Sequence, residues 1–342
     1  MKVKYILSAI LILAVLCLGA FGYVYSIVMS PQVELDETVY IYIDKDDTEE
    51  TVVAKIVEAS NLRSVQGFRL LAWHNGFDKQ MRTGKYAIYN NDNMRALYHR
   101  IVSNQQTPVK VTLPSTRTVE QLVSAVCNQL MMDTLELLPF ITQEAYYRRI
   151  GYTEETLPSL FLPNTYEVYW NISPEKFMIR IMKEHRAFWN ESRMAKAKAI
   201  GLTPAEVATL ASIVDEETNS NSEKPIVAGL YLNRLKRGML LQADPTVKFA
   251  IGDFTRKRIL NADLETDSPY NTYKYKGLPP GPIRIPTLQA IESVLNHAKH
   301  NYIYMCAKED FSGEHNFATT LSAHNANARK YREALNKLRI KK

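Results

Sequence analysis

The feature that most limits the fold of this chain is an uncharged apolar segment near its N-terminus. It covers residues 5–29 and reads YILSAILILAVLCLGAFGYVYSIVM. As a helix, these 25 residues extend roughly 37 Å, enough to cross a hydrocarbon core of about 30 Å. A cleaved signal peptide has an apolar region of only about 7–15 residues. The segment therefore predicts an uncleaved transmembrane helix that crosses the membrane once.

Charges on the two sides of this segment predict its orientation. Two lysines precede it and three acidic residues follow it (Lys2, Lys4, Glu34, Asp36, Glu37). Because basic residues favour the cytoplasmic side, residues 1–4 are expected in the cytoplasm. The rest of the chain is then expected outside the cytoplasmic (inner) membrane, which is the periplasm in a Gram-negative host.

The net charge of +6 suits an anionic neighbourhood such as a membrane surface or an acidic polymer. The sequence has no basic stripe interleaved with aromatic residues, so it does not predict binding to nucleic acid. Outside the apolar segment only Cys127 and Cys306 remain. Both lie among apolar neighbours, so buried free thiols are the default expectation, and the sequence leaves a single disulfide open.

The remaining chain divides into three regions and predicts an α+β fold. Residues 30–38 resemble a short linker, and residues 39–114 alternate predicted strands and helices in a compact α+β unit. Residues 115–342 form a mainly helical domain. In it, a helix of about 25 residues is expected to start after Ser173 and to end at Gly201.

Three adjacent acids lie near the end of another predicted helix, in the segment ASIVDEETNS (211–220). The helix opens at TPAE, with Thr203 as its cap, Pro204 at the first position and Glu206 closing a capping box. Counting by three and four along the apolar row leads from Glu206 to Glu217. Glu217 is therefore expected to face inward.

The other two acids have different helical phases. Glu216 continues a polar row and is expected in water, whereas Asp215 follows small residues and is expected to have a supporting role at most. Burial, neighbouring negative charge and the helix C-terminus all favour a protonated Glu217, as a general acid at neutral pH requires. The alternative is that all three acids cap a helix end in water.

Three loops downstream are rich in Pro, Gly, Tyr and Asn: residues 241–247, 263–273 and 276–283. Rigid loops with aromatic and amide side chains fit a sugar-binding cleft, because rings stack on pyranose faces and amides bond hydroxyl groups. Taken singly, each loop is more often structural.

These segments resemble the YceG/MltG-like family of endolytic murein transglycosylases. The resemblance rests on LASIVDEET, LNRL, LQADPTV, DLET, YNTY, GLPPGPI and LSAHN, all within residues 210–325. The family usually has IVEKET at the first of these, and its second Glu, the catalytic acid, corresponds to Glu217. The resemblance also implies a LysM-like subdomain at residues 39–114 and a transglycosylase catalytic domain at 115–342.

The implied reaction is cleavage of the β-1,4 bond between N-acetylmuramic acid and N-acetylglucosamine in nascent peptidoglycan strands, with a 1,6-anhydro end as product. Glu217 is expected to be the general acid and then the base. The expected substrate-binding residues are Gln242, Asp244, Asn271, Tyr273, His315 and Asn325, and Asp215 and Glu265 are expected to support the acid.

Two alternatives remain at this point: a non-catalytic peptidoglycan-binding scaffold of the cell-wall synthesis machinery, and a muramidase that uses water as its nucleophile. In the muramidase, Asp244, Asp263 or Glu265 would be the second carboxylate. No cofactor is expected, and no metal, because neither His297 and His300 nor His315 and His324 have the spacing of a known metal motif. The expected partners are glycan strands, the membrane and cell-wall synthases.

Overall fold

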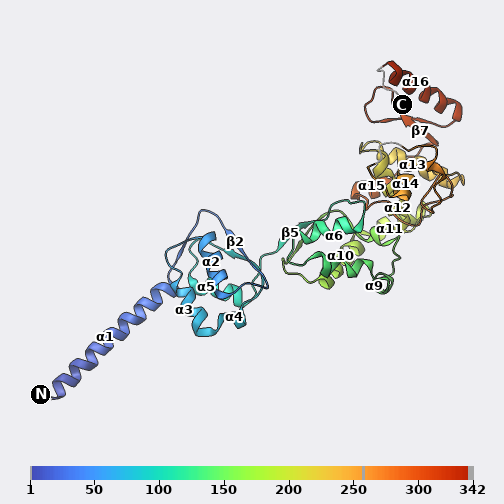
Figure 1. The fold of residues 1–342 in the computed structure, drawn as a ribbon. Helices are drawn as coiled ribbons and strands as arrows, with labels where there is room; N and C mark the ends of the chain where they lie inside the picture. The colour runs from blue at the N-terminus through green and yellow to red at the C-terminus, as the bar shows by residue number, and fades with distance from the viewer. Residues whose placement is uncertain (1, 256–258, 338–342) are drawn as a thin grey trace. The chain divides into compact units, whose positions relative to one another are not determined.

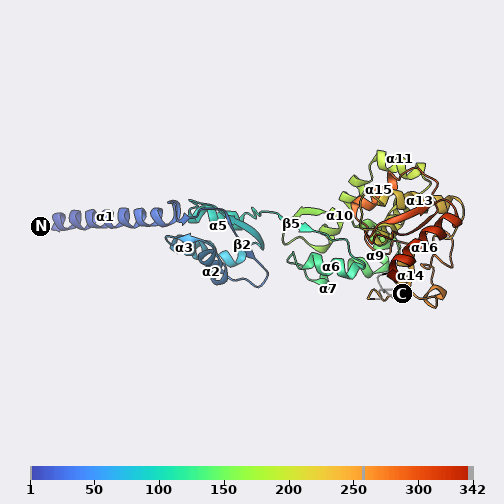
Figure 2. The same ribbon diagram turned by 90° about the horizontal axis from the view of Figure 1, so that it is seen from above.

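A computed structural model describes residues 2–255 and 259–337 of the chain (Figures 1 and 2). Met1 and the last five residues of the basic C-terminal segment lie outside the described residues. The chain separates into two compact units. The first consists of residues 1–111, 129–131 and 167–172, and the second of residues 112–128, 132–166 and 173–342. Helices dominate and the strands are short, so the expected α+β class is confirmed.

The first unit begins with the apolar helix α1 (Lys2–Met29). Its residues from Val3 to Met29 have a mean hydropathy of 2.5, which makes the helix long and apolar enough to cross a membrane. A helix suits such a segment because it satisfies its own backbone hydrogen bonds where no water can. The predicted apolar helix is confirmed, and its last turn packs against the rest of the unit.

A two-stranded antiparallel sheet organises the rest of this unit. Strands β2 and β4 pair from Val39 opposite Ile88 to Ile43 opposite Gly84. Ile41 and Ile43 point into the core, while Tyr40 and Tyr42 stay 43% and 40% exposed, so the predicted alternation of β2 is confirmed. The elements after α1 are β1 (Val33–Glu34), β2 (Val39–Ile43), α2 (Glu49–Ala59), β3 (Asn61–Leu62), α3 (Gln66–Asn75), α4 (Phe77–Gln80), β4 (Gly84–Ile88), α5 (Met94–Val102) and β5 (Val109–Thr112).

The segment expected to be a linker is part of this unit. Val33 and Glu34 form β1, which pairs with β3 in the antiparallel register. Gln32 and Val33 are only 7% and 3% exposed. The buried side chains of Gln32 and Val33 therefore fix the backbone in this part of the segment.

The second unit is mainly helical. It contains α6 (Val119–Cys127), α7 (Thr134–Leu137), α8 (Pro139–Thr142), α9 (Glu144–Arg149), a 3-10 turn at Leu157–Leu160, α10 (Pro174–Phe188), α11 (Glu191–Ala199), α12 (Pro204–Glu217), α13 (Lys224–Lys236), α14 (Asp244–Ile251), a 3-10 turn at Asp263–Glu265, α15 (Leu288–Leu295) and α16 (Leu321–Lys337). Its strands are short: β7 (Tyr304–Ala307) pairs with β8 (His315–Ala318) in an antiparallel hairpin, and β6 (Thr165–Val168) belongs to this unit only in its first two residues.

The single long helix expected after Ser173 is two helices in the structure. Ser173 caps α10 as predicted, but α10 ends at Phe188. Asn190 then adopts an extended conformation, and its side chain accepts a hydrogen bond from the backbone N–H of Arg193 to start α11. An asparagine cap can begin a new helix without any glycine or proline.

Helix α12 lies at the centre of the second unit. Every residue from Val207 to Asp215 is buried, and α12 packs against α13 and α15. Its start follows the prediction: the side chain of Thr203 accepts from the N–H of Glu206, the Glu206 carboxylate accepts from the N–H of Thr203, and Pro204 is the first helical residue. This central position brings the C-terminal acids of α12 among side chains from several other elements.

Candidate active site

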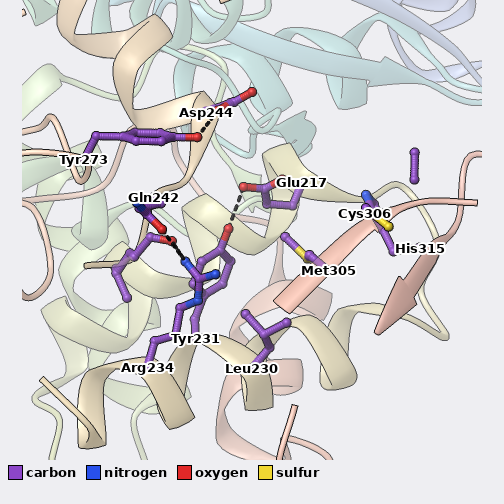
Figure 3. A pocket seen from close by; sticks show the side chains of 12 residues that line it. Glu217, Leu230, Tyr231, Arg234, Gln242, Asp244, Tyr273, Met305, Cys306 and His315 are labelled. Carbon is purple, nitrogen blue, oxygen red and sulfur yellow. Dashed lines mark hydrogen bonds between the residues drawn. The ribbon is translucent and has the colours of Figure 1, made fainter. Parts of the chain in front are cut away.

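A pocket of about 230 Å³ opens at the C-terminal end of α12 (Figure 3). Its walls come from five parts of the second unit: the end of α12, one side of α13, the start of α14 with the preceding loop, the loop at Tyr273, and the β7–β8 hairpin. The lining residues are Glu217, Leu230, Tyr231, Arg234, Leu241, Gln242, Asp244, Tyr273, Met305, Cys306, Ala307 and His315.

Glu217 is the acid of α12 that reaches this pocket, as its helical phase predicts. The hydroxyl of Tyr231 donates a 2.6 Å hydrogen bond to Glu217 Oε1. Burial raises the pKa of the Glu217 carboxyl to about 7, against an ordinary 4.5. The bond from Tyr231 lowers this pKa, and the nearby Asp244 raises it again. Near neutral pH, Glu217 therefore divides between its protonated and ionised forms, which suits a group that donates and then accepts a proton.

Asp215 is buried and holds three segments together. Its Oδ1 accepts a 2.7 Å bond from the Lys224 ammonium at the start of α13, and its Oδ2 accepts a 2.6 Å bond from the backbone N–H of Thr287 before α15. The side chains of Asp215 and Lys224 are only 3% and 8% exposed. Asp215 does not line the pocket, so it can act on Glu217 only by fixing the elements around it.

The expectation that Glu216 points into water was wrong. Its Oε1 accepts a 2.7 Å bond from Arg284, and its Oε2 accepts a 3.1 Å bond from Arg117. The row on which Glu216 lies is polar but buried: Ser212 is 0% exposed, and its hydroxyl accepts from the N–H of Ile283. Because these partners come from distant loops, the helical pattern alone marks a polar row without showing what covers it.

Two expected residues, Asp244 and Tyr273, meet on the far wall of the pocket. The Tyr273 hydroxyl donates a 2.5 Å hydrogen bond to Asp244 Oδ1 (Figure 3). Gln242, just before α14, also lines the pocket and has a left-handed backbone with φ of 49°. This conformation is uncommon for a residue other than glycine, and such strain is frequent at functional sites. The bond from its backbone N–H to the carbonyl of Thr272 fixes Gln242 on the Tyr273 loop.

His315 lines the pocket from β8 and is held by a buried carboxylate. Glu223 accepts a 2.6 Å bond from the His315 backbone N–H and lies 3.1 Å from its Nδ1. A carboxylate can only accept, so the proton of the neutral ring is on Nδ1 in this contact. The Thr218 hydroxyl, one residue after Glu217, also donates to Glu223. Glu223 therefore connects the end of α12 to the hairpin wall.

Besides Asp215, three of the predicted site residues do not line the pocket. Asn271 is 0% exposed, and its amide group donates to the carbonyls of Leu264 and Thr266 while its oxygen accepts from the N–H of Tyr273. It shapes the loop and has no free polar atom for a substrate. Glu265 is exposed in the 3-10 turn before this loop, and Asn325 is exposed on α16, in a separate groove beside Arg329.

The sequence reasoning missed Tyr231 and Arg234, which both lie on α13. Arg234 is 8% exposed, and it donates 2.7 Å bonds to the carbonyls of Ile303 and Leu241. A tyrosine and an arginine three residues apart, and so on one side of the helix, are the signal that could have identified them. Cys306 also lines the pocket, and Cys127 and Cys306 are both free thiols. Across residues 2–255 and 259–337, no three His, Cys, Asp or Glu side chains gather as metal ligands would.

Comparison with known proteins identifies the family of this chain. The profile of the YceG-like family matches residues 41–330, which is most of the chain. The chain belongs to the YceG-like family. Within this YceG-like chain, the matched region includes the pocket and its complete lining.

Curated relatives share the family and have named activities. An endolytic murein transglycosylase of Bacillus subtilis is 25% identical over 328 residues, which cover 92% of this chain and 90% of that protein. A protein of the same name from Streptococcus pneumoniae R6 is 33% identical over 180 residues, covering 51% of this chain but only 30% of the relative. A solved YceG-like protein from Listeria monocytogenes shares the fold, with a TM-score of 0.56 and 23% identity over 85% of this chain and 99% of that one.

Proposed function

We propose that the chain is an endolytic peptidoglycan transglycosylase in which Glu217 is the catalytic acid and base. The observation that carries this proposal is the pKa of Glu217, raised to about 7 by burial at the edge of a pocket that four other protein segments complete. A carboxyl group in this state can protonate a leaving group at neutral pH. Membership of the YceG-like family and the names of its curated relatives support the same reaction.

The proposed reaction needs no nucleophile from the protein. Protonated Glu217 gives its proton to the oxygen that bridges N-acetylmuramic acid and N-acetylglucosamine, and the bond from C1 to that oxygen breaks. The 6-hydroxyl of the muramic residue then attacks C1, closes the 1,6-anhydro ring and returns its proton to Glu217. Atoms balance without water, because the proton donated in the first step is recovered in the second.

Side chains beside Glu217 support this cycle. Tyr231 donates to the carboxylate and so stabilises the ionised form that remains after the first proton transfer. On the opposite wall, Tyr273, Asp244 and Gln242 present a ring, a carboxylate and an amide, the groups that bind sugar rings and hydroxyls. We assign these three, with His315, to substrate binding, and we withdraw Asn271, Glu265 and Asn325 from the site.

Helix α1 is proposed to anchor the protein in the cytoplasmic membrane, with residues 1–4 inside and both units outside. Its length and its mean hydropathy of 2.5 support a span, and Lys2 and Lys4 support the orientation. An anchored enzyme of this kind would reach glycan strands while synthases extend them at the membrane. The antiparallel pair of β2 and β4, with α2 and α3 between these strands along the chain, supports a LysM-like subdomain there.

The decisive experiment is mass spectrometry of the products that the purified full-length chain releases from uncross-linked glycan strands. We expect ends one water lighter than reducing ends, and we expect Glu217→Gln to abolish them. Glu191→Gln is the matched control, because Glu191 is exposed at the start of α11. Cleavage that persists in Glu217→Gln contradicts the site assignment.

The same spectra separate the two alternatives. Reducing ends in place of anhydro ends would identify a muramidase, for which Asp244 is the carboxylate in the same pocket. An unmodified chain that binds strands but releases no product would identify a scaffold protein.

A further inference from the structure

From the junction between α1 and the first unit, we propose that helix α3 is a membrane-contacting foot. Its exposed side chains Gln66, Arg69 and Trp73 would lie among the lipid headgroups of the bilayer that α1 crosses. This inference rests on the proposed anchoring by α1, and it adds an interaction surface on the first unit itself.

The end of α1 is packed against this unit without a flexible joint. A Cβ atom on Gly67 of α3 would lie 2.0 Å from the carbonyl oxygen of Ile27, so the two backbones approach as closely as only glycine permits. Val28 is 7% exposed. The Asn93 side chain donates a 3.1 Å bond to the carbonyl of Met29, and that of Gln32 donates a 2.9 Å bond to the carbonyl of Ser26. The position of α3 is therefore fixed relative to the end of α1.

Aromatic residues on α1 indicate where the hydrocarbon core ends. Tyr5 and Tyr25 are 72% and 55% exposed. They are 20 residues apart, which corresponds to about 30 Å along a helix and matches the thickness of the hydrocarbon core. Tyrosine is enriched at both interfaces of a membrane. The turn from Ile27 to Met29 then lies in the headgroup layer, at the depth where Gly67 contacts it.

Helix α3 presents an unusual side chain six residues beyond this contact. Trp73 is 78% exposed, among the most exposed large hydrophobic residues outside α1. Gln66, Arg69 and Trp73 follow one another at intervals of three and four, so they share one side of α3, opposite the buried Phe68 and Ala72. A tryptophan ring suits the border between apolar and wet regions, and an arginine beside it suits lipid phosphates.

Both ribbon views agree with this arrangement. Helix α3 lies beside the last turn of α1, at the end of the unit from which α1 emerges (Figures 1 and 2). Helix α2 lies farther along the unit from α1. Helix α3 thus lies at the end of the unit that would be nearest the membrane surface.

The test uses the full chain in vesicles of phosphatidylethanolamine and phosphatidylglycerol. Flotation with the vesicles reports anchoring. The fluorescence of Trp73 is obtained as the difference between the unmodified chain and Trp73→Phe, because Trp170 and Trp189 remain in both. We expect lipids brominated near the carbonyl end of their acyl chains to quench most of this difference signal, and lipids brominated near the methyl end to quench it less. Arg69→Glu should weaken the quenching.

The matched control combines Trp73→Phe with Val57→Trp, since Val57 is 49% exposed on α2. The indole at position 57 should stay accessible to aqueous iodide and insensitive to brominated lipid. A chain that floats while Trp73 behaves like the indole at position 57 overturns the foot and leaves the anchor intact. A chain that does not float overturns both the anchor and the foot.

Discussion

Replacing Glu217 with glutamine should abolish cleavage and, at alkaline pH, stabilise the second unit. The reason is the pKa of the buried carboxyl, about 7 in the folded chain against an ordinary 4.5. A carboxyl whose pKa is raised on folding contributes stability that is complete below pH 4.5 and is lost as the pH rises through about 7. Glutamine stays neutral, so the variant does not lose this contribution.

The size of the effect follows from the two pKa values. Their difference corresponds to about 3 kcal/mol in the free energy of unfolding when the pH is well above both values. Water in the pocket screens the charge, so we expect about 1–2 kcal/mol. At roughly 2–4 °C per kcal/mol for a domain of this size, the melting temperature should rise by about 2–8 °C at pH 8.5. At pH 4 the two proteins should melt together.

The assay is thermal unfolding of the full chain in detergent, followed by circular dichroism at both pH values. Glu216→Gln is the matched control, one residue away on the same helix. It weakens the bonds to Arg117 and Arg284, so it should lower the melting temperature at pH 8.5, by about 1.5–3 kcal/mol in free energy. If Glu217→Gln also lowers the melting temperature at pH 8.5, the carboxyl is not strained by ionisation and the argument for a general acid fails.

Three further substitutions test other parts of the site. Tyr231→Phe removes the hydrogen bond that favours ionised Glu217, so the pKa of Glu217 should rise above 7. In a pH–rate profile, the acid that limits cleavage should then titrate at higher pH. A shift to lower pH would contradict the assignment. Lys224→Met leaves Asp215 buried without its cation, so it should lower the free energy of unfolding by about 3–5 kcal/mol, measured by thermal unfolding. The double variant Lys224→Met/Asp215→Asn should recover part of this loss. Equal stability of the single and double variants would show that the pair is not coupled. Asn271→Ala should lower the melting temperature because two loop carbonyls lose their hydrogen bonds. Gln242→Ala should weaken glycan binding at an unchanged melting temperature. The reverse pattern would return Asn271 to the binding surface.

The parts of this molecule that the sequence predicts are those decided by neighbours along the chain. Thr203, Pro204 and Glu206 set the start of α12 through bonds that span three residues, and a helical count from that start selects Glu217. The apolar run of α1 similarly predicts that helix from the residues of the segment alone. Local signals of this kind depend on spacing alone, and spacing can be read without knowing the fold.

The environment of Glu216 and the role of Asn271 could not be predicted in this way. Arg117 is 99 residues from Glu216 and Arg284 is 68 residues from it, so the sequence of the helix does not show that these two side chains bind Glu216. For Asn271, the amide group suits a sugar and a backbone carbonyl equally well, and only the folded loop brings the carbonyls of Leu264 and Thr266 to it. Residue type gives the chemistry that is available, while long-range packing decides what it contacts.

The three adjacent acids of α12 show how packing can select one of them for chemistry. Successive residues of a helix point about 100° apart, so the three carboxylates meet different surroundings. Lys224 neutralises Asp215, and Arg117 and Arg284 neutralise Glu216. Within the described ranges Glu217 forms no ion pair, and the hydroxyl of Tyr231 donates a hydrogen bond to it. Lys224, Arg117 and Arg284 are paired with these two neighbours, and the effect of burial exceeds that of Arg234, which lowers the pKa of Glu217. Burial therefore raises the pKa of Glu217 while the other two acids keep the helix end in place.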